Sequence, residues 1–250
     1  MNDDVLHRLR VLKLPGIREH LDARLLEAQA NDLAYEDFLS MLLTDEIEAR
    51  TSRRIARLLH RSGLGSDTTL ETFDFSFNPS VSGKQIKSLA SCRFIERAEG
   101  VFFIGPTGTG KTHLAKALAH QACRLMFSVA FYSFHQLFAE LPAADLQNRL
   151  PVLMKRLMKV DLLVIDDFGF KTIDQASAER FYAIVDARFR SKSIILTSNR
   201  AMTDWPALFP DPIMANAILD RLAHTSHQIV IKGQSYRNKL QVQKEEEALA

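Results

Sequence analysis

The sequence has little cysteine and no long apolar run, and both scarcities restrict the kind of protein it encodes. Only two cysteines, Cys92 and Cys123, occur in 250 residues, too few for a disulfide framework or a cysteine-paired metal site. No run of about 18 apolar residues is present, and the first ten residues carry acids in place of an apolar signal segment. We therefore expect a cytoplasmic protein that has no contact with a membrane.

An excess of charge of one sign is also lacking. Lysine and arginine number 32 against 30 acidic residues, a net charge of +2, so composition alone does not indicate a nucleic-acid partner, and the positions of the basic residues must decide. With 46% hydrophobic and 25% charged residues, the chain is typical of a globular protein with a sizeable core. The length suits one main domain with a smaller one appended.

Glycine is scarce too, yet three of the ten glycines fall in the run Gly105-Pro-Thr-Gly-Thr-Gly-Lys-Thr112. This run fits G-x-x-x-x-G-K-[ST] at every fixed position. The apolar stretch Val101–Ile104 before it and the Ala-rich segment after it predict the strand and helix that the motif requires, which argues against a chance glycine-rich turn. Glycines let backbone N–H groups curl toward phosphate oxygens. Lys111 would then contact the β- and γ-phosphates, and the Thr112 hydroxyl would bind Mg²⁺. The sequence thus predicts a site for a nucleoside triphosphate and Mg²⁺, formed by Gly105, Pro106, Thr107, Gly108, Thr109, Gly110, Lys111, Thr112 and His113.

Two later apolar stretches also end in polar side chains. Residues 162–165 precede Asp166 and Asp167, about 55 positions after the phosphate loop, and residues 193–197 precede Ser198 and Asn199. The carboxyl ends of parallel strands meet at one edge of a sheet, where ligands bind. Asp166 would hold Mg²⁺ directly or through water, and Asp167 would orient or deprotonate the attacking water. Asn199 would hydrogen-bond the γ-phosphate or that water, unless it is a polar strand end without a role.

Five predicted strands alternate with helical sequence, which predicts an α/β fold with a doubly wound parallel five-stranded sheet. Before it, three helices are expected; the third, about Tyr35 to Arg61, would pack through Tyr35, Phe38, Leu39, Leu42 and Leu43. Another helix, beginning at His135, is expected to end at Pro142. The predicted organisation is a small all-helical domain over residues 1–63, a linker over 64–82, an ATPase domain over 83–240 and a flexible tail over 241–250.

Arginines gather at the end of the third predicted helix. Arg50, Arg53, Arg54, Arg57 and Arg61 follow one another at steps of 3, 1, 3 and 4, which places all five on one helical face. This arginine stripe is either a solvated basic face, a face that pairs with acids of a neighbouring subunit, or a surface for nucleic-acid phosphates. It contains no aromatic residue for base stacking, which favours duplex DNA over single strands.

The predicted linker contains a second pattern, Phe73-Asp-Phe75-Ser-Phe77, in which aromatic residues alternate with polar ones. Two interpretations remain open. The aromatic side chains would either lie beside the nucleotide base or dock the linker on the core.

Taken together, these segments resemble the IstB/DnaC branch of the AAA+ ATPases, and within it the IstB-like transposition helper ATPases. The matching segments cover nearly the whole chain, and the most discriminating are Ala217-Ile-Leu-Asp-Arg221-Leu-x-His224 and Gly233-x-Ser-Tyr-Arg237. The resemblance implies an AAA+ ATPase that oligomerises on duplex DNA when ATP is bound, assists a transposase, and is reset by hydrolysis. It also implies that Arg221 is an arginine finger acting on a neighbouring subunit, and that Arg237 faces phosphate. The alternative is that Arg221 only forms an ion pair with a surface acid.

The sequence departs from the family pattern at Asp167, where many AAA+ ATPases have a glutamate, which puts the role of Asp167 as base in question. Two rival functions also remain. A DnaC-like loader of a replicative helicase would share the ATPase core but would hold a helicase through its N-terminal region. A small-molecule kinase would need a substrate pocket and lid, for which the sequence offers no candidate.

Overall fold

The computed structural model describes residues 3–65 and 68–236. The chain divides into two compact units, one up to Arg57 and one from Leu58 onward, and this division falls inside helix α3 (Tyr35–Ser62). The predicted domain boundary at residue 63 remains a prediction, and the predicted tail over 241–250 lies outside the described residues.

The N-terminal unit consists of α1 (Asp3–Val11), α2 (Pro15–Ala30) and the first part of α3. Its buried core is small and consists of Ile17, Leu21 and Leu42. A buried carboxylate, Glu46, accepts the backbone N–H of Gly16 at 2.7 Å, at the start of α2, where a negative charge is favoured by the helix dipole. Burial opposes the charge of Glu46, but hydrogen bonds from Arg50 and the α2 amides hold the pKa of this carboxyl below its ordinary value.

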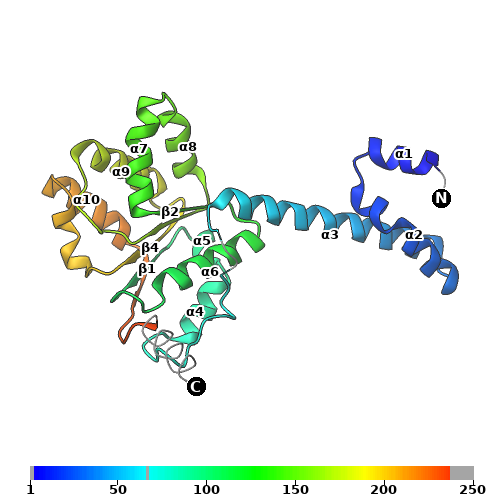
Figure 1. Cartoon of the computed structure of the whole chain (residues 1–250), viewed down its shortest axis with the longest axis horizontal. Helices are drawn as coiled ribbons and strands as arrows, with labels where there is room; N and C mark the ends of the chain where they lie inside the picture. Colours follow the sequence, from blue (N-terminus) through cyan, green and yellow to red (C-terminus); the bar gives the residue numbers. More distant parts are fainter. Residues whose placement is uncertain (1–2, 66–67, 237–250) are drawn as a thin grey trace, which may run out of the picture. The chain divides into compact units, whose positions relative to one another are not determined.

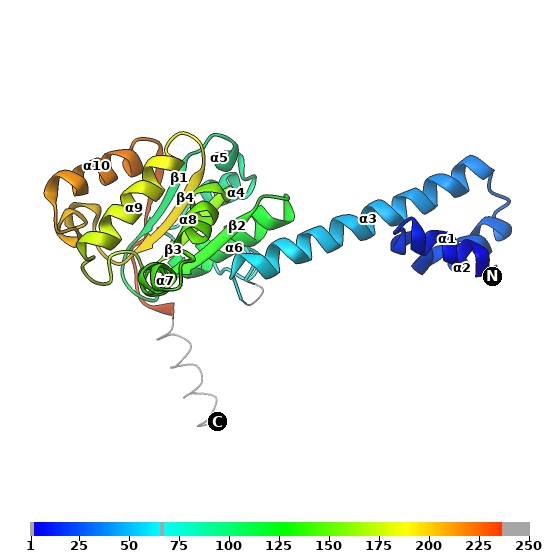
Figure 2. The ribbon, with the colours of Figure 1, turned by 90° about the horizontal axis from the view of Figure 1, so that it is seen from above.

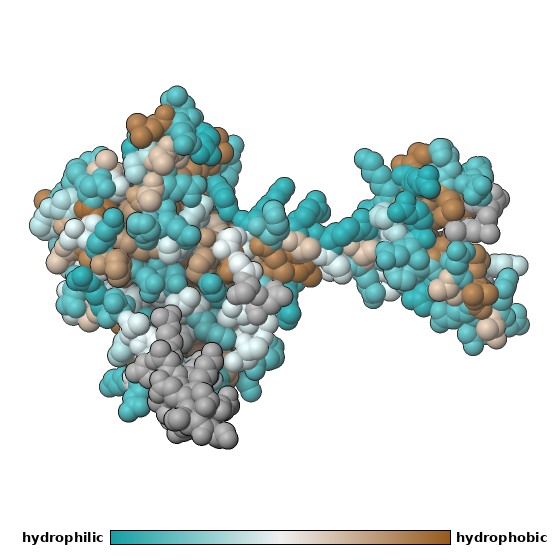
Figure 3. All heavy atoms as spheres, in the orientation of Figure 1, coloured by the Kyte–Doolittle hydropathy of each residue, from teal (hydrophilic) through white to brown (hydrophobic). Residues whose placement is uncertain are grey.

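The predicted packing face of α3 is only half correct. Leu42 is buried and Phe38 packs beside it, but Tyr35, Leu39 and Leu43 are 94%, 56% and 49% exposed. Figure 3 shows hydrophobic side chains, in brown, on the surface of this unit. Two apolar rows lie next to each other on α3, and helical spacing alone does not tell which of them meets α2.

The second unit is built on a parallel five-stranded sheet in the order β2-β3-β4-β1-β5 (Figure 1). The strands are β1 (Gly100–Ile104), β2 (Val129–Ser133), β3 (Leu162–Asp166), β4 (Ser193–Ser198) and β5 (Ser226–Val230). This confirms the predicted fold class. The strand order places β4 between β1 and β3, so the three motif-bearing strands are neighbours and end at the same edge.

Helices cover both faces of the sheet (Figures 1 and 2). They are α4 (Gly83–Ala90), α5 (Arg93–Glu96), α6 (Lys111–Arg124), α7 (Phe134–Leu146), α8 (Leu150–Lys159), α9 (Gln175–Arg188) and α10 (Pro212–Ala223), with 3-10 turns at Met202–Asp204 and Pro206–Leu208. Along β1, Val101 and Phe103 belong to the core under α4 and α6, whereas Phe102 and Ile104 belong to the core under α7 to α10, as the alternation of side chains along a strand requires.

The prediction that Pro142 ends a helix is wrong, because α7 continues through it to Leu146. Proline removes one backbone hydrogen bond from a helix interior. Here Leu141 and Ala144, on either side of the proline, are buried at 0% and 3% exposure, and their packing holds the helix together.

Among the described helices, none is long and apolar enough to cross a membrane.

Candidate nucleotide-binding site

The phosphate loop follows β1 and includes the first two residues of α6, Lys111 and Thr112, so a strand and a helix flank it as predicted. Two of its glycines adopt conformations that other residues rarely take, Gly108 with φ 81° and Gly110 with φ 94°. Space forbids a side chain there as well: a Cβ on Gly108 would lie 2.1 Å from Ser235 Oγ, and one on Gly110 would lie 2.6 Å from the Phe73 ring. Both glycines are therefore required by the shape of the loop and by the segments packed on it.

Lys111 lies against the inside of this loop. Its side chain is buried, and its Nζ donates to the carbonyl oxygen of Pro106 at 2.7 Å. The Thr109 hydroxyl donates to the same oxygen at 2.9 Å. The ammonium group is thus in the concave part of the loop, where the motif predicts phosphate oxygens.

The tip of β3 meets the start of α6 at a threonine and an aspartate. The Thr112 hydroxyl donates to Asp166 Oδ1 at 2.9 Å, so the structure brings together the two residues predicted to bind Mg²⁺. Burial raises the pKa of the Asp166 carboxyl above its ordinary value, the Thr197 hydroxyl opposes this shift, and the neighbouring Asp167 adds to it. A cation bound here would stabilise the ionised form of the Asp166 carboxyl group.

The donor set is of the kind that holds Mg²⁺. One hydroxyl and one carboxylate are hard oxygen ligands, and Mg²⁺ is commonly held by one or two such groups together with substrate phosphates. Among the described residues, no group of three or more His, Cys, Asp or Glu side chains is placed to hold a metal without such help.

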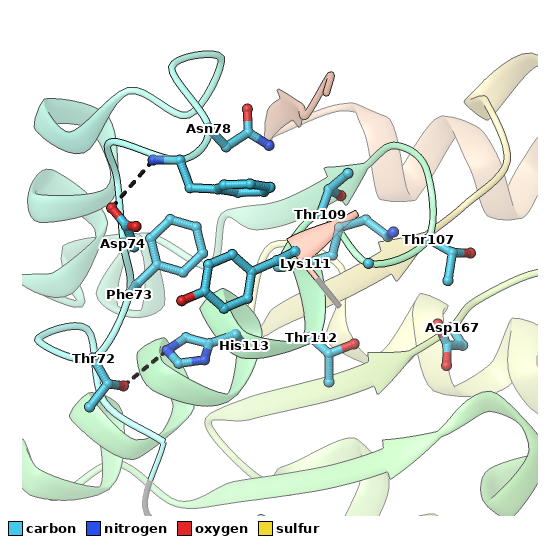
Figure 4. Close-up of a pocket in the computed structure, with 14 residues that line it drawn as sticks. Thr72, Phe73, Asp74, Asn78, Thr107, Thr109, Lys111, Thr112, His113 and Asp167 are labelled. Atoms are coloured by element: carbon cyan, nitrogen blue, oxygen red, sulfur yellow. Dashed lines mark hydrogen bonds between the residues drawn. The ribbon is translucent and has the colours of Figure 1, made fainter. Parts of the chain in front are cut away.

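Asp167 lies at the far end of the same pocket. Figure 4 shows it below Thr107 and to the right of Thr112, away from Phe73 and His113. The residue has a left-handed backbone with φ 55°, which is uncommon for a residue with a side chain. Asn199, by contrast, is exposed just after β4 and is not among the residues that line the pocket. Its predicted contact with phosphate or water remains a prediction.

The other end of the pocket is aromatic. Phe73 and Phe77 of the linker line it together with Tyr236, and the Phe77 and Tyr236 rings meet edge to face at 4.9 Å. Phe73 lies 5.5 Å from the His113 ring. Phe73 and Phe75 also pack on the core, which confirms that these side chains dock the linker. A place beside the nucleotide base remains a prediction. The sequence placed Tyr236 in a family segment without indicating a role in the pocket; its backbone N–H donates to the Gly108 carbonyl at 2.9 Å. Flanking sequence alone offers no signal for this contact.

Arg221 lies away from the pocket. Its guanidinium donates to Asp186 Oδ1 at 2.9 Å and lies over the Tyr182 ring at 5.2 Å. It borders a small hollow beside Gly100, the first residue of β1, whereas the phosphate loop follows the last residue of that strand. Arg221 and the phosphate loop therefore lie at opposite ends of β1, and a strand of five residues is about 16 Å long at about 3.3 Å per residue. Arg237 lies outside the described residues.

All five side chains of the arginine stripe are exposed, but they differ in their partners. Arg50 donates to Glu46 at 2.7 Å, and Arg53 lies 3.8 Å from the same carboxylate. For Arg54 and Arg57 the described residues provide no ion-pair partner. In the second unit, the Arg61 carbonyl accepts a hydrogen bond from Arg156 of α8 at 2.7 Å, which brings a further cation close to the end of the stripe.

A phosphate loop after β1, with paired carboxylates ending β3, defines an α/β nucleotide-binding protein. Solved structures confirm the fold. DnaI superposes with a TM-score of 0.57 at 22% identity, covering 66% of this chain and 91% of that chain. DnaA from Aquifex aeolicus, bound to AMPPCP, gives 0.56 at 22% identity, covering 74% and 57%. The DnaC helicase loader gives 0.54 at 21% identity, covering 66% and 97%. The fold is that of the AAA+ domains of DnaA and DnaC.

The family follows from the sequence comparisons. Residues 7–244 match the family described as IstB-like ATP binding protein, and the chain belongs to this family. A Mycobacterium tuberculosis protein named for ATP binding in an insertion sequence is 38% identical over 230 residues, covering 92% of each chain. A Pseudomonas aeruginosa protein named for ATP binding in insertion sequence IS21 is 38% identical over 238 residues, covering 94% of this chain and 90% of the relative.

Proposed function

We propose that this protein is a cytoplasmic ATPase that assists the transposition of an insertion sequence. With ATP and Mg²⁺ bound, it would assemble on duplex DNA and recruit or stimulate the transposase, and hydrolysis would then release the assembly. The observation that carries the ATPase part is the placement of Lys111, Thr112 and Asp167 around one pocket, with Asp166 bonded to Thr112. The names of the relatives support the link to insertion sequences.

Within the pocket, each end has its own chemistry. The phosphates of ATP would lie along the loop amides and Lys111, and the base would lie among Phe73, Phe77 and Tyr236. Mg²⁺, held by Thr112 and Asp166, would neutralise charge on the phosphate oxygens. Asp167 would accept a hydrogen bond from the attacking water and orient it toward the γ-phosphate.

Completion of the site would need a second subunit. Arg221 borders the sheet edge opposite its own phosphate loop, so it would act on the nucleotide of a neighbour. An arginine supplied in this way stabilises charge on the transferred phosphoryl group, which makes hydrolysis wait for assembly. Arg237 would add a further phosphate contact, and Asn199 would turn toward the γ-phosphate in that assembly.

DNA would be held by its backbone through the arginine stripe. Arg54 and Arg57 carry most of this expectation, because Arg50 and Arg53 share the buried carboxylate of Glu46. Contacts of this type are independent of sequence and weaken steeply with salt.

A second candidate function is the loading of a replicative helicase. The observation in its favour is the likeness of the fold to DnaI and to the DnaC helicase loader. Both functions use the same ATPase unit, so they differ in the partner: a loader would hold a helicase and would not need duplex DNA.

Phosphate release from ATP tests the proposed activity. The assay is run on the protein alone, with random-sequence duplex DNA, and with DNA and the transposase encoded by the same element. We expect slow turnover alone and an increase with each addition. Absence of turnover in all three conditions would contradict the ATPase proposal, and stimulation by a helicase but not by duplex DNA would favour the loader.

A further inference from the structure

One buried hydroxyl forms hydrogen bonds with both Asp166 and Asp167. Thr197, near the end of β4, is fully buried. Its Oγ1 donates to Asp166 Oδ1 at 2.5 Å and accepts the backbone N–H of Asp167 at 2.9 Å. A hydroxyl has one hydrogen to donate and lone pairs that accept, so both contacts form at once.

We propose that Thr197 is the positioning residue for both carboxylates, so that β4 sets where the Mg²⁺ ligand and the water-orienting group lie. This inference rests on the proposed ATP hydrolysis. It concerns a residue that touches neither phosphate nor water in the proposed mechanism and lies outside the pocket lining.

The geometry explains why a hydroxyl is needed. Asp166 Oδ1 receives hydrogen bonds from Thr112 and Thr197, one from each flanking element, and these two bonds fix the plane of the carboxylate. Asp167 has a left-handed backbone, so the direction of its side chain depends on how its amide is held. Ordering partners of this type commonly change metal affinity or activity by about 10- to 100-fold when removed.

The same segment has further anchors that do not use the hydroxyl. The Phe168 N–H donates to the Thr197 carbonyl at 2.7 Å, and the Ser198 hydroxyl donates to the Phe168 carbonyl at 2.7 Å. The Gly105 N–H donates to the Ser198 carbonyl at 3.1 Å. Replacing Thr197 by valine, which has nearly the same shape, leaves these anchors in place and removes only the contacts to the aspartates.

The test compares Thr197→Val with Thr197→Ser, which restores the hydroxyl, and with Ser198→Ala, which removes an anchor but no contact to a carboxylate. Two quantities are measured: kcat and KM for ATP hydrolysis, and the gain in ATP affinity on adding Mg²⁺, by calorimetry. For Thr197→Val we expect kcat to fall about 10- to 100-fold and the Mg²⁺-dependent gain to shrink, with Mg²⁺-free affinity unchanged. Thr197→Ser should stay close to the wild type, and Ser198→Ala should lose less than the valine variant.

Wild-type behaviour of Thr197→Val in both measurements would overturn the proposal, and so would equal losses in Thr197→Val and Ser198→Ala, since the role would then be mere tethering. If the valine variant does not fold, Thr197→Cys decides, because the thiol is a weak donor of similar size: a fall in kcat supports the proposal and a wild-type kcat overturns it. Wild-type protein that binds ATP without hydrolysing it would refute the ATPase instead, and the Mg²⁺-dependent binding would still decide the role of Thr197.

Discussion

Thr112 Oγ1 lies 2.9 Å from Asp166 Oδ1, although the two residues are 54 positions apart in the chain. The contact joins the start of the phosphate-loop helix to the tip of β3. It exists because the parallel strands end at one edge, with only β4 between β1 and β3. Parallel α/β sheets bind ligands at this edge, and here the edge carries the hydroxyl, the carboxylates and the phosphate loop together.

Asp167→Asn should bind ATP as the wild type does and fail to hydrolyse it. The amide keeps the shape of the side chain but does not accept a proton, so we expect turnover to fall by about 100-fold or more. Phosphate release and calorimetric ATP binding are measured on the same preparation. Asp174→Asn is the control, because Asp174 caps α9 and asparagine caps a helix equally well. Undiminished hydrolysis by Asp167→Asn would remove Asp167 as the base.

Tyr236→Ala should weaken the binding of ATP but not that of inorganic tripolyphosphate. Tyr236 contributes to the aromatic end of the pocket, and a lost aromatic contact to a base costs about 1–3 kcal/mol, or about 5- to 150-fold in Kd. Competition against a fluorescent nucleotide gives both affinities. Tyr35→Ala is a suitable control, since that side chain is 94% exposed in the N-terminal unit. An equal loss of affinity for ATP and for tripolyphosphate would show that Tyr236 does not contact the base.

The sequence was sufficient to predict the sheet and to place the phosphate-loop residues and the paired carboxylates at one sheet edge, because both depend on local patterns. Composition indicates the strand at Val101–Ile104 and the glycine-rich loop after it, and the paired carboxylates follow an apolar stretch that predicts another strand. The aromatic end was only half predicted. Tyr236 reaches the pocket through the packing of its segment on Gly108, a long-range contact that no periodicity encodes.

Two other features were not predicted from the sequence, because both depend on which side chains of a helix are buried. Pro142 usually ends helices, but burial of the flanking Leu141 and Ala144 outweighs its local effect. In the arginine stripe, spacing made Arg50 and Arg57 equivalent. Arg50 and Glu46 have the i, i+4 spacing of a helical ion pair, but the spacing does not show that Glu46 is buried and that its charge needs Arg50.

Arg221→Ala and Lys111→Ala should each be inactive alone and should recover activity when mixed. An Arg221→Ala subunit keeps an intact pocket, and a Lys111→Ala subunit still supplies Arg221 to its neighbour, so mixed interfaces contain one complete site. Phosphate release is measured across mixing ratios with duplex DNA present. Arg190→Ala, which removes another exposed arginine near the hollow that Arg221 borders, should stay active. If the mixtures release phosphate no faster than the sum of the two variants measured separately, Arg221 does not act in trans.

Replacing Arg54 and Arg57 together by alanine should reduce the salt dependence of duplex binding. Each lost phosphate contact lowers the log–log slope by about 0.9, so the double variant should lose about 2 units of slope. Titrations at several salt concentrations measure this slope. Lys84 and Lys87 of α4 provide a charge-matched control pair. An unchanged slope in the Arg54 and Arg57 variant would show that the stripe does not contact DNA.

The central claim is that ATP drives assembly on duplex DNA, and fluorescence anisotropy of a labelled random-sequence duplex of about 50 base pairs tests it directly. The protein is titrated with and without ATP and Mg²⁺, beside Lys111→Ala, which should not bind nucleotide. The account predicts tight binding that requires ATP, is absent in Lys111→Ala and weakens steeply with salt. Absence of duplex binding in the presence of ATP and Mg²⁺ would contradict it and favour the helicase-loading alternative.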